Sequence, residues 1–474
     1  MSGLFHTLGI GAESLYTSRQ GVDTSGHNIA NAHTEGYSRQ RVNVAQRDPT
    51  DVRGGILIGN GVYVGSINRV HDKFVEKQYN QSQQEAGASE KKFEGIKNIS
   101  QIFSPELTAN LSDEMTKFFN SLQDLSSFPD DVTARTSVRE NAIDLINGFR
   151  KIDADLDSNQ MQLNQSVNHL ATEASDLVKD IAGLNVKIQV AEAGRKSEAN
   201  DLRDQRDTIV NKLANIMDVN YYEDERGMMT VRGVGDMLFV EGAHHVELTT
   251  ESKAENQALV DLVVVDQNGY KRAITDKVGS GQLRGLLDLR DQFIPQLRVK
   301  NDEMVTTFVG EFNKIHREGF GLNDFKEING VNFFNEVGSE PGAAKRLSLS
   351  DEISMSTDAI AAAVSVNAPG DNVNLNELVG LKDRKILSGG NANLTEYYAG
   401  IVGEVGLEVV RTSNLKDAND IMLSDIKSRK DAVSGVSLDE EAMDLMKWQS
   451  SFAASSKLIT TVDEMLETVL SLKR

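Results

Sequence analysis

Apolar positions recur at both ends of the chain with the alternating four- and three-residue spacing of a heptad repeat. Near the N-terminus this spacing is kept by Leu4, Leu8, Gly11, Leu15, Ser18, Val22, Ser25, Ile29 and Ala32. Near the C-terminus it is kept by Leu445, Trp448, Phe452, Ser455, Ile459, Val462, Leu466 and Val469. Such spacing places a stripe on one face of a helix. We therefore predict a helix at each end, with the two stripes packed against each other or against further copies of the chain.

The N-terminal stripe is a weak source of stability. Gly11, Ser18 and Ser25 occupy every second position and bury little apolar surface. Each glycine also costs a helix about 1 kcal/mol relative to alanine. We expect that this segment does not hold a helix on its own. The C-terminal helix begins more firmly, because Ser437 and Glu440 in SGVSLDEEA have the spacing of a capping box.

The longest periodic stretch lies in the middle of the chain. Its heptad runs from Ala142 to Ala191 with two polar lapses and no proline. A helix of that length is about 75 Å long at 1.5 Å per residue. Gly194 then permits a reversal, and the stripe from Leu202 to Ile216 predicts a returning antiparallel helix.

The period changes near residue 220. Short apolar runs separated by glycine-containing turns predict strands in the segment 220–280. Asn268-Gly269 lies between two of these runs and is typical of a two-residue hairpin. In the glycine-rich segment 54–65 we likewise expect Asn60-Gly61 to join two strands as a hairpin.

Helical spacing returns after this region, from Leu283 to Ile315, where Pro295 is expected to kink or split the helix. A loop-rich stretch follows at 320–372, and a last heptad segment runs from Tyr398 to Val433. The predicted fold is mainly α with a β-rich insertion, drawn out as a multi-domain rod of long heptad helices. Its units are the N-terminal part of an inner coiled-coil domain (1–80), a first rod segment (81–219), a small outer β domain (220–280), a second rod segment (281–434) and the C-terminal helix of the inner domain (435–474).

Charge and composition narrow the classes of function. The formal net charge is −21, which disfavours nucleic acid and anionic membranes as partners. Residues 1–80 carry 8 Lys and Arg against 7 Asp and Glu, and residues 435–474 carry 4 against 7. Both ends are close to neutral, which suits surfaces that pack beside copies of themselves. No run approaches the roughly 18 apolar residues of a membrane helix, and the first residues lack the pattern of a cleavable secretory signal.

No residue pattern typical of an active site or cofactor site is evident. The chain has no cysteine, which excludes disulfides and thiolate chemistry. Its 8 histidines form no HExxH, and the pair His244-His245 reads as part of a strand. There is no GxSxG, and the many acidic residues are typical of solvated helix faces. We therefore predict a protein that is not an enzyme and that holds no metal or cofactor.

Three stretches resemble the axial proteins of the bacterial flagellar rod and hook. Residues 25–40, SGHNIANAHTEGYSRQ, are similar to the signature in which an N-terminal helix ends in Asn-Ile-Ala-Asn-Ala. Residues 434–472, which begin SGVSLDEEAMDLMKWQ, are similar to the C-terminal helix of the hook-associated branch. Residues 290–320 resemble the family's helix that ends in Asn313, His316 and Gly319.

The resemblance implies an inner domain built from both termini, a helical rod outside it and a β domain outermost. It implies a structural junction between hook and filament, a homo-oligomeric layer whose neighbours are the hook protein and the next hook-associated protein. The implied place is extracellular, in the flagellum, after export without a cleavable signal peptide and with an export chaperone on the C-terminal helix. In that reading both ends are unfolded in the monomer and become ordered on assembly.

The residues predicted to form the assembly interface lie on the two end segments. They are Leu4, Leu8, Leu15, Val22, Ile29, Asn28, Asn31, Gly36, Tyr37, Arg39, Leu445, Trp448, Phe452, Ile459, Val462, Leu466 and Val469. By the resemblance, Asn28 and Asn31 bond backbone where the first helix ends, and Gly36 supplies the turn. Tyr37 and Arg39 then anchor the following loop.

Three other interpretations stay open on the sequence. One is another rod or hook subunit, although subunits without the long helix of 142–191 would pass quickly from the N-terminal motif into β structure. A second is a secreted coiled-coil adhesin or adaptor with a β head. A third is a hydrolase in the β-rich region, for which no nucleophile–base or metal spacing is visible.

Overall fold

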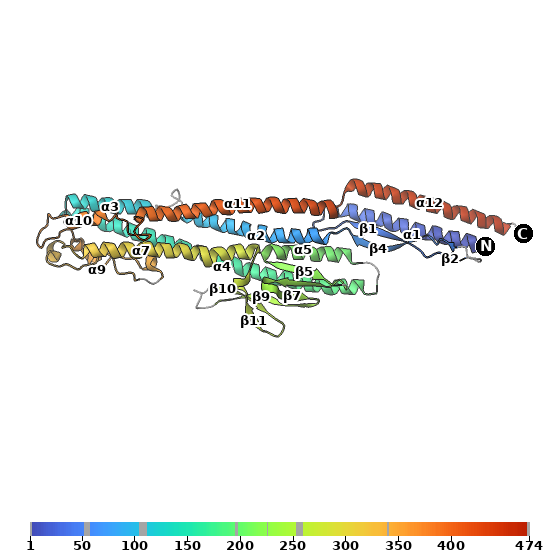
Figure 1. The fold of residues 1–474 in the computed structure, drawn as a ribbon, viewed down its shortest axis with the longest axis horizontal. Helices are drawn as coiled ribbons and strands as arrows, with labels where there is room; N and C mark the ends of the chain where they lie inside the picture. Colours follow the sequence, from blue (N-terminus) through green and yellow to red (C-terminus); the bar gives the residue numbers. More distant parts are fainter. Residues whose placement is uncertain are drawn as a thin grey trace.

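The computed structural model describes residues 2–51, 57–103, 111–194, 198–224, 226–252, 259–338 and 341–471. They form an elongated, mainly helical rod with both chain ends at the same end of the molecule (Figure 1). The predicted fold class, mainly α with a β-rich insertion, is confirmed. Within the described ranges, no helix combines the length and the hydropathy needed to cross a membrane.

The rod is a bundle of long helices. They are α2 (Lys73–Ile102), α3 (Leu111–Ser127), α4 (Val132–Glu192), α5 (Asn200–Ile216), α7 (Ile294–His316) and α11 (Leu394–Ser434). α4 begins before the predicted heptad because the side chain of Asp131 accepts hydrogen bonds from the N–H groups of Thr133 and Ala134 and caps its first turn. The apolar stripe of α4 is buried in the bundle, and α5 returns alongside α4 as predicted.

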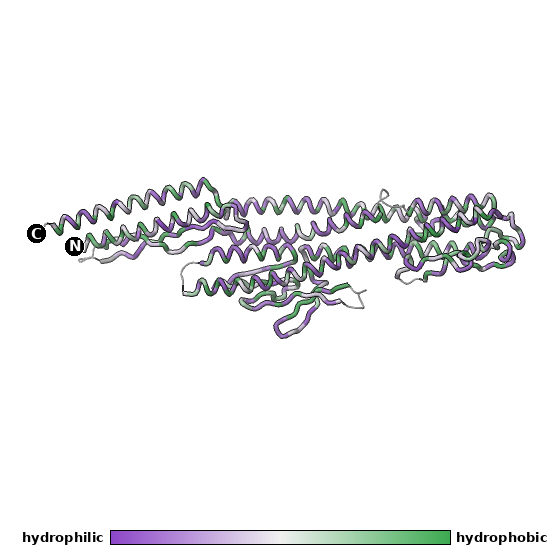
Figure 2. The backbone as a smooth tube through the Cα atoms, turned by 180° about the vertical axis from the view of Figure 1, so that it is seen from behind, coloured by the Kyte–Doolittle hydropathy of each residue, from purple (hydrophilic) through white to green (hydrophobic). Residues whose placement is uncertain are grey.

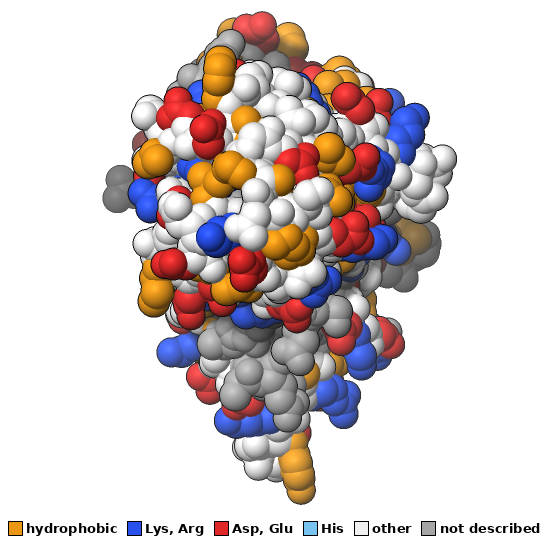
Figure 3. Space-filling view, turned by 90° about the vertical axis from the view of Figure 1, so that its left-hand side faces the viewer, with side chains coloured by type: hydrophobic (Ala, Val, Ile, Leu, Met, Phe, Trp, Pro, Cys, Tyr) orange, Lys and Arg blue, Asp and Glu red, His pale blue; other side chains and the backbone are white. Residues whose placement is uncertain are grey.

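Aromatic packing closes the end of the rod farthest from the termini. The rings of Phe118, Phe119, Phe308, Phe312, Phe333 and Phe334 contact one another with centroids 4.8 to 6.3 Å apart. The segment 320–372 is loop-rich as predicted and contains the short helices α8 (Ala343–Arg346) and α9 (Asp351–Met355), with α10 (Val373–Gly380) after it. Figure 3 shows hydrophobic and charged side chains interspersed on the described surface of this end.

The helix around Pro295 is split as predicted, through a change of helix type. α6 (Gly281–Leu287) runs into a π-helical turn, η4 (Asp288–Phe293), and α7 starts directly after it. The N–H of Ile294 donates to the carbonyl oxygen of Leu289. Pro295 lies in the first turn of α7, where a missing N–H costs little.

The β-rich segment forms two small antiparallel sheets. Their strands, in sheet order, are β5 (Val219–Glu223), β6 (Met229–Gly233), β7 (Met237–Glu241) and β8 (His244–His245), and then β11 (Lys271–Ala273), β10 (Val260–Val265) and β9 (Glu247–Ser252). The predicted turn at Asn268-Gly269 joins β10 to β11, with Gly269 at φ +81°. Both sheets flank α4 and do not extend the far end of the rod (Figure 1). Asn185 of α4 holds the first sheet there, since it donates to the carbonyl oxygens of Met229 and Gly242 at 2.8 Å each.

At the terminal end, α1 (Ser2–Ala30) packs against α12 (Leu438–Ser471), one of the two arrangements expected for the end stripes. A ribbon of β1 (Gln40–Gln46) and β4 (Val62–Arg69) follows and lies on α1. The predicted hairpin at Asn60-Gly61 is wrong, because β3 (Leu57–Ile58) pairs with β2 (Thr50–Asp51) and β4 pairs with β1. Arg47 donates its N–H to the carbonyl oxygen of Gly61, so this turn continues the longer β1–β4 ribbon.

Candidate functional site: the terminal helix pair and its joint with the rod

Small residues let α1 and α12 approach closely. Gly11 and Gly21 are buried on α1. A Cβ atom at Gly11 would stand 2.9 Å from Cγ1 of Ile459, and one at Gly21 would stand 2.2 Å from the ring of Trp448. The indole therefore packs directly on the backbone of α1. Trp448 thus anchors the contact between the two helices.

Serine pairs add polar contacts along the same interface. The hydroxyls of Ser14 and Ser455 are 2.7 Å apart, and Ser18 donates to the hydroxyl of Ser451 at 3.1 Å. Ser18 and Ser455 are buried. These positions satisfy each other's hydroxyl groups and contribute little apolar burial, so the stability of the isolated pair is limited.

The predicted interface residues of the helix pair differ in burial. Half-buried or buried are Leu4, Leu8, Leu15, Val22, Leu445, Trp448, Ile459, Val462 and Leu466. Exposed are Ile29 at 38%, Phe452 at 42% and Val469 at 40%. Further large apolar side chains of the two helices are also exposed, namely Phe5, Tyr16, Met443, Met446, Met465 and Leu470. Figure 2 shows hydrophobic positions recurring along the whole of both helices.

Asn28 organises the exit from α1. It is 1% exposed, donates from Nδ2 to the carbonyl oxygen of Gln40 at 2.9 Å and accepts the N–H of Gln40 at Oδ1, also at 2.9 Å. The hydroxyl of Tyr37 donates to the same Oδ1 at 2.7 Å and lies 3.0 Å from Nδ1 of His27. The amide of Asn28 therefore ties the end of α1 to the start of β1.

The turn between them is held against α5. Gly36 has φ +78°, and a Cβ atom there would stand 2.1 Å from the hydroxyl of Thr208. Both facts require glycine. Asn31 donates from Nδ2 to the carbonyl oxygen of His27 at 3.0 Å, and Thr34 donates to Oδ1 of Asn31 at 3.2 Å.

Arg39 connects this turn to the start of α12. Its Nε lies 2.6 Å from the carboxylate of Glu441, which is 1% exposed, and its guanidinium also pairs with Glu440 and with Asp444. Burial alone would lower the pKa of Arg39, but the carboxylates Glu440 and Glu441 outweigh it and raise that pKa. The predicted capping box is half present. Ser437 accepts the N–H of Glu440 at 3.5 Å, whereas the carboxylate of Glu440 binds Arg39.

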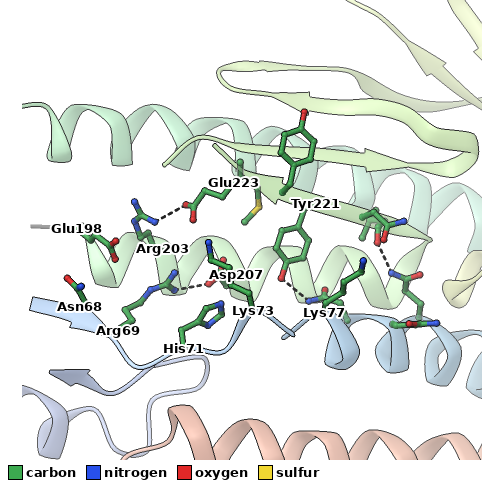
Figure 4. A pocket seen from close by; sticks show the side chains of 17 residues that line it. Asn68, Arg69, His71, Lys73, Lys77, Glu198, Arg203, Asp207, Tyr221 and Glu223 are labelled. Carbon is green, nitrogen blue, oxygen red and sulfur yellow. Dashed lines mark hydrogen bonds and ion pairs between the residues drawn. The ribbon is translucent and has the colours of Figure 1, made fainter. Parts of the chain in front are cut away.

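A buried ion-pair cluster fixes the joint to α5. Arg69, at the end of β4, binds Asp204 at 2.8 Å and Asp207 at 2.7 Å, and Ser38 donates its N–H to Asp204 at 2.9 Å. Burial alone would lower the pKa of Arg69. The carboxylates Asp207 and Asp204 raise it by more, so the pKa of Arg69 lies above its usual value. Burial raises the pKa of Asp204, and Arg69 offsets part of that rise. Figure 4 shows Arg69 reaching Asp207.

Sequence reasoning found the turn but missed its partners. The contacts from Arg69 to Asp204 and from Arg39 to Glu440 join residues 135 and 401 positions apart. No local spacing signals such pairs. The N-terminal segment, the rod and the C-terminal helix meet in one polar joint. This arrangement fixes their relative positions. Among the described residues, no cluster of three or more side chains suited to hold a metal ion is found.

Comparisons with known proteins agree on one group. The family described as "Flagellar hook-associated protein FlgK helical domain" matches residues 96–334. The family described as "Flagellar basal body rod FlgEFG protein C-terminal" matches residues 432–472. These ranges include most of the rod and all of α12.

Whole-length relatives and a solved structure match as well. The chain is 26% identical to "Flagellar hook-associated protein 1" of Bacillus subtilis (strain 168), over 99% of each chain. It is 24% identical to the protein of that name from Salmonella typhimurium (strain LT2), over 97% of this chain and 98% of the relative. The fold is similar to that of the flagellar hook junction protein FlgK from Burkholderia pseudomallei, with a TM-score of 0.66 and 15% identity, covering 75% of this chain and 100% of the other.

Proposed function

This chain belongs to the family of flagellar hook-associated FlgK proteins and is a structural component of the bacterial flagellum, and we propose that it forms the junction layer between hook and filament. Many copies make the layer, with the hook protein on one side and the next hook-associated protein on the other. The layer acts as a mechanical connector. Each copy contributes one rigid rod and one pair of terminal helices, and together the copies join two helical lattices.

The observation that carries this proposal is the set of exposed apolar side chains on the α1–α12 pair. Phe5, Phe452 and Met443 are 59%, 42% and 59% exposed in a single chain. Burying one such side chain contributes about 1.5–3 kcal/mol. Neighbouring copies that cover these side chains supply stability that the glycine- and serine-rich contact within one chain lacks. The ends are therefore unfolded in the monomer and become ordered on assembly.

The low stability of the two ends also explains export and the need for protection before assembly. Ends that do not fold alone let the chain pass a narrow export channel without a cleaved signal, to reach the extracellular flagellum. An export chaperone binds the segment of α12 until then. The exposed Met443, Met446 and Met465 suit such a partner, because flexible thioether side chains adapt to different surfaces.

A deletion strain tests the junction role. Cells without the chain are expected to stop swimming and to release filament material into the medium, while hooks remain on the cells in electron micrographs. Return of the full chain restores attached filaments, whereas a chain truncated after Gly435 does not. Attached filaments of normal number in the deletion strain would show the proposal to be wrong.

A further inference from the structure

We propose that neighbouring copies touch laterally at the level of the joint, where a basic and aromatic knob of one copy enters an acidic cleft of the next. The knob is Lys73, Phe74 and Lys77 at the start of α2. The cleft lies between the turn after α1 and the helices α4 and α5. This inference rests on the proposed layer of many copies and names the surfaces by which those copies meet.

The knob is exposed, and its two lysines also line a cleft of their own chain that holds Arg69, Lys73, Lys77 and Arg203 against Glu198, Asp207 and Glu223. Phe74 is 68% exposed, and Lys73 and Lys77 are also exposed. Within the described residues neither lysine forms an ion pair. Their spacing along α2 places all three side chains on one arc of about 100°. Figure 4 shows the two lysines beside each other at this end of α2.

The cleft offers an apolar floor and an acidic rim. It has a volume of about 640 Å³, and Leu184 and Ile209 lie in it. Gly183 also lines the cleft, and a Cβ atom there would meet nothing within 4 Å. A cavity of about 150 Å³ already holds a benzene ring, so an aromatic side chain fits. The exposed carboxylates Glu35 and Asp180 belong to the rim.

The remaining charges around the cleft leave it acidic. Asp204 is engaged by Arg69, and Asp201 accepts a hydrogen bond from Gln40 at 2.8 Å and lies 3.8 Å from Nε2 of His27. Lys187 is the one lysine or arginine among the described residues that line the cleft. Glu35 and Asp180 have no ion-pair partner within the described residues. A neighbour that brings two lysines and one phenylalanine therefore matches both the rim and the floor.

The positions of the knob and the cleft allow each copy to contact the next one in a ring or helical layer. Asp201, Asp204 and Thr208 face the cleft, whereas Arg203 and Asp207 line a second cleft on another side of α5, together with Lys73 and Lys77. Arg69 contacts both Asp204 and Asp207, so knob and cleft lie at one level of the rod. Two different patches on different sides make a heterologous contact, which generates rings or helical layers and not closed pairs.

Cross-linking in isolated flagella tests the contact directly, because the chain has no cysteine of its own. Cells produce two variants together, Lys77→Cys and Asp180→Cys, and the flagella are treated with a short bismaleimide. Covalent dimers are expected in the mixture and not with either variant alone. A matched pair, Lys77→Cys with Lys345→Cys at the far end of the rod, is expected to stay monomeric. The inference is overturned if the mixture stays monomeric while both thiols react with a simple maleimide.

Charge reversal supplies a second readout. The variant Lys73→Glu/Lys77→Glu is expected to lower the number of attached filaments per cell several-fold, and adding Glu35→Lys/Asp180→Lys in the same chain is expected to restore it. The control Lys97→Glu/Lys345→Glu makes the same change in net charge at exposed sites away from the joint and should have no effect. No loss, or a loss without rescue, contradicts the lateral contact. Failure of the proposed function is distinguishable, because the unaltered chain would then be absent from flagella.

Discussion

Gly21 sets how closely α1 can approach α12. Replacement by alanine puts a methyl group where the indole of Trp448 lies, since the added Cβ would stand 2.2 Å from that ring. Overpacking of this kind costs about 1–3 kcal/mol, which exceeds the gain of about 1 kcal/mol in helix propensity. We expect Gly21→Ala to lower the temperature at which filaments detach from heated cells.

Gly26 provides the matched control on the same helix. A Cβ atom there would meet nothing within 4 Å. Gly26→Ala should therefore keep filaments attached at least as well as the unaltered chain, because it adds only helix propensity. Equal detachment temperatures for the two variants would contradict close packing of Trp448 on α1.

His316 couples the far end of the rod to pH. It is fully buried, lies 2.8 Å from the carbonyl oxygen of Val331 through Nδ1 and accepts the N–H of Ala361 at Nε2 at 3.0 Å, an arrangement that fits the neutral ring. Burial lowers the pKa of His316 to about 4. Between the unfolded pKa of about 6.5 and this value, the unfolded chain binds a proton that the native chain does not, so stability is greatest above pH 6.5 and falls toward pH 4.

The size of that loss is roughly 3 kcal/mol, because one pKa unit corresponds to about 1.4 kcal/mol. Urea midpoints measured between pH 8 and pH 4 should fall less steeply for His316→Gln than for the unaltered chain. His33→Gln, at an exposed position, should keep the original slope. Identical slopes for all three chains would show that His316 titrates alike in the folded and unfolded states.

At the scale of elements, the ion pairs of Arg69 decide how the β1–β4 ribbon meets α5. Arg69 and Asp204 are each 7% exposed, so Arg69→Met leaves a buried carboxylate without its cation. Losing one partner of a buried pair costs about 3–5 kcal/mol. We expect a clearly lower urea midpoint by circular dichroism. Lys151→Met, which removes a solvent-exposed pair with Asp155, should leave the midpoint unchanged.

The same elements show what sequence patterns can reach. The heptad of 142–191 predicted α4, and Asn268-Gly269 predicted the β10–β11 turn, because each signal lies within the element that it specifies. Asn60-Gly61 is an equally local signal, and it predicted that the strands on either side pair with each other. The strand after this turn, β4, instead pairs with β1. The joint is the least predictable part from the sequence, because Arg39 binds Glu440, a residue 401 positions away. Such contacts depend on how the helices and strands pack after they have formed.

For the whole molecule, stability is distributed unevenly along the long axis. The rod contains a continuous apolar core from Ile96 to Val405 in which most members are almost fully buried. The contact between α1 and α12 is built largely from glycine and serine, and many apolar side chains of both helices stay exposed in a single chain. Local opening follows this difference, because segments with few buried apolar contacts open at low free-energy cost.

Limited proteolysis of the purified monomer measures that difference. We expect trimming of about the first 60 and the last 35 residues, with a resistant middle, since cleavage concentrates where backbone opens most easily. Mass spectrometry of the fragments locates the cuts, and the same digestion of assembled flagella should spare both ends because copies cover them there. Early cuts within α4, or equal protection of α1 and α12 in monomer and flagella, would contradict ordering on assembly.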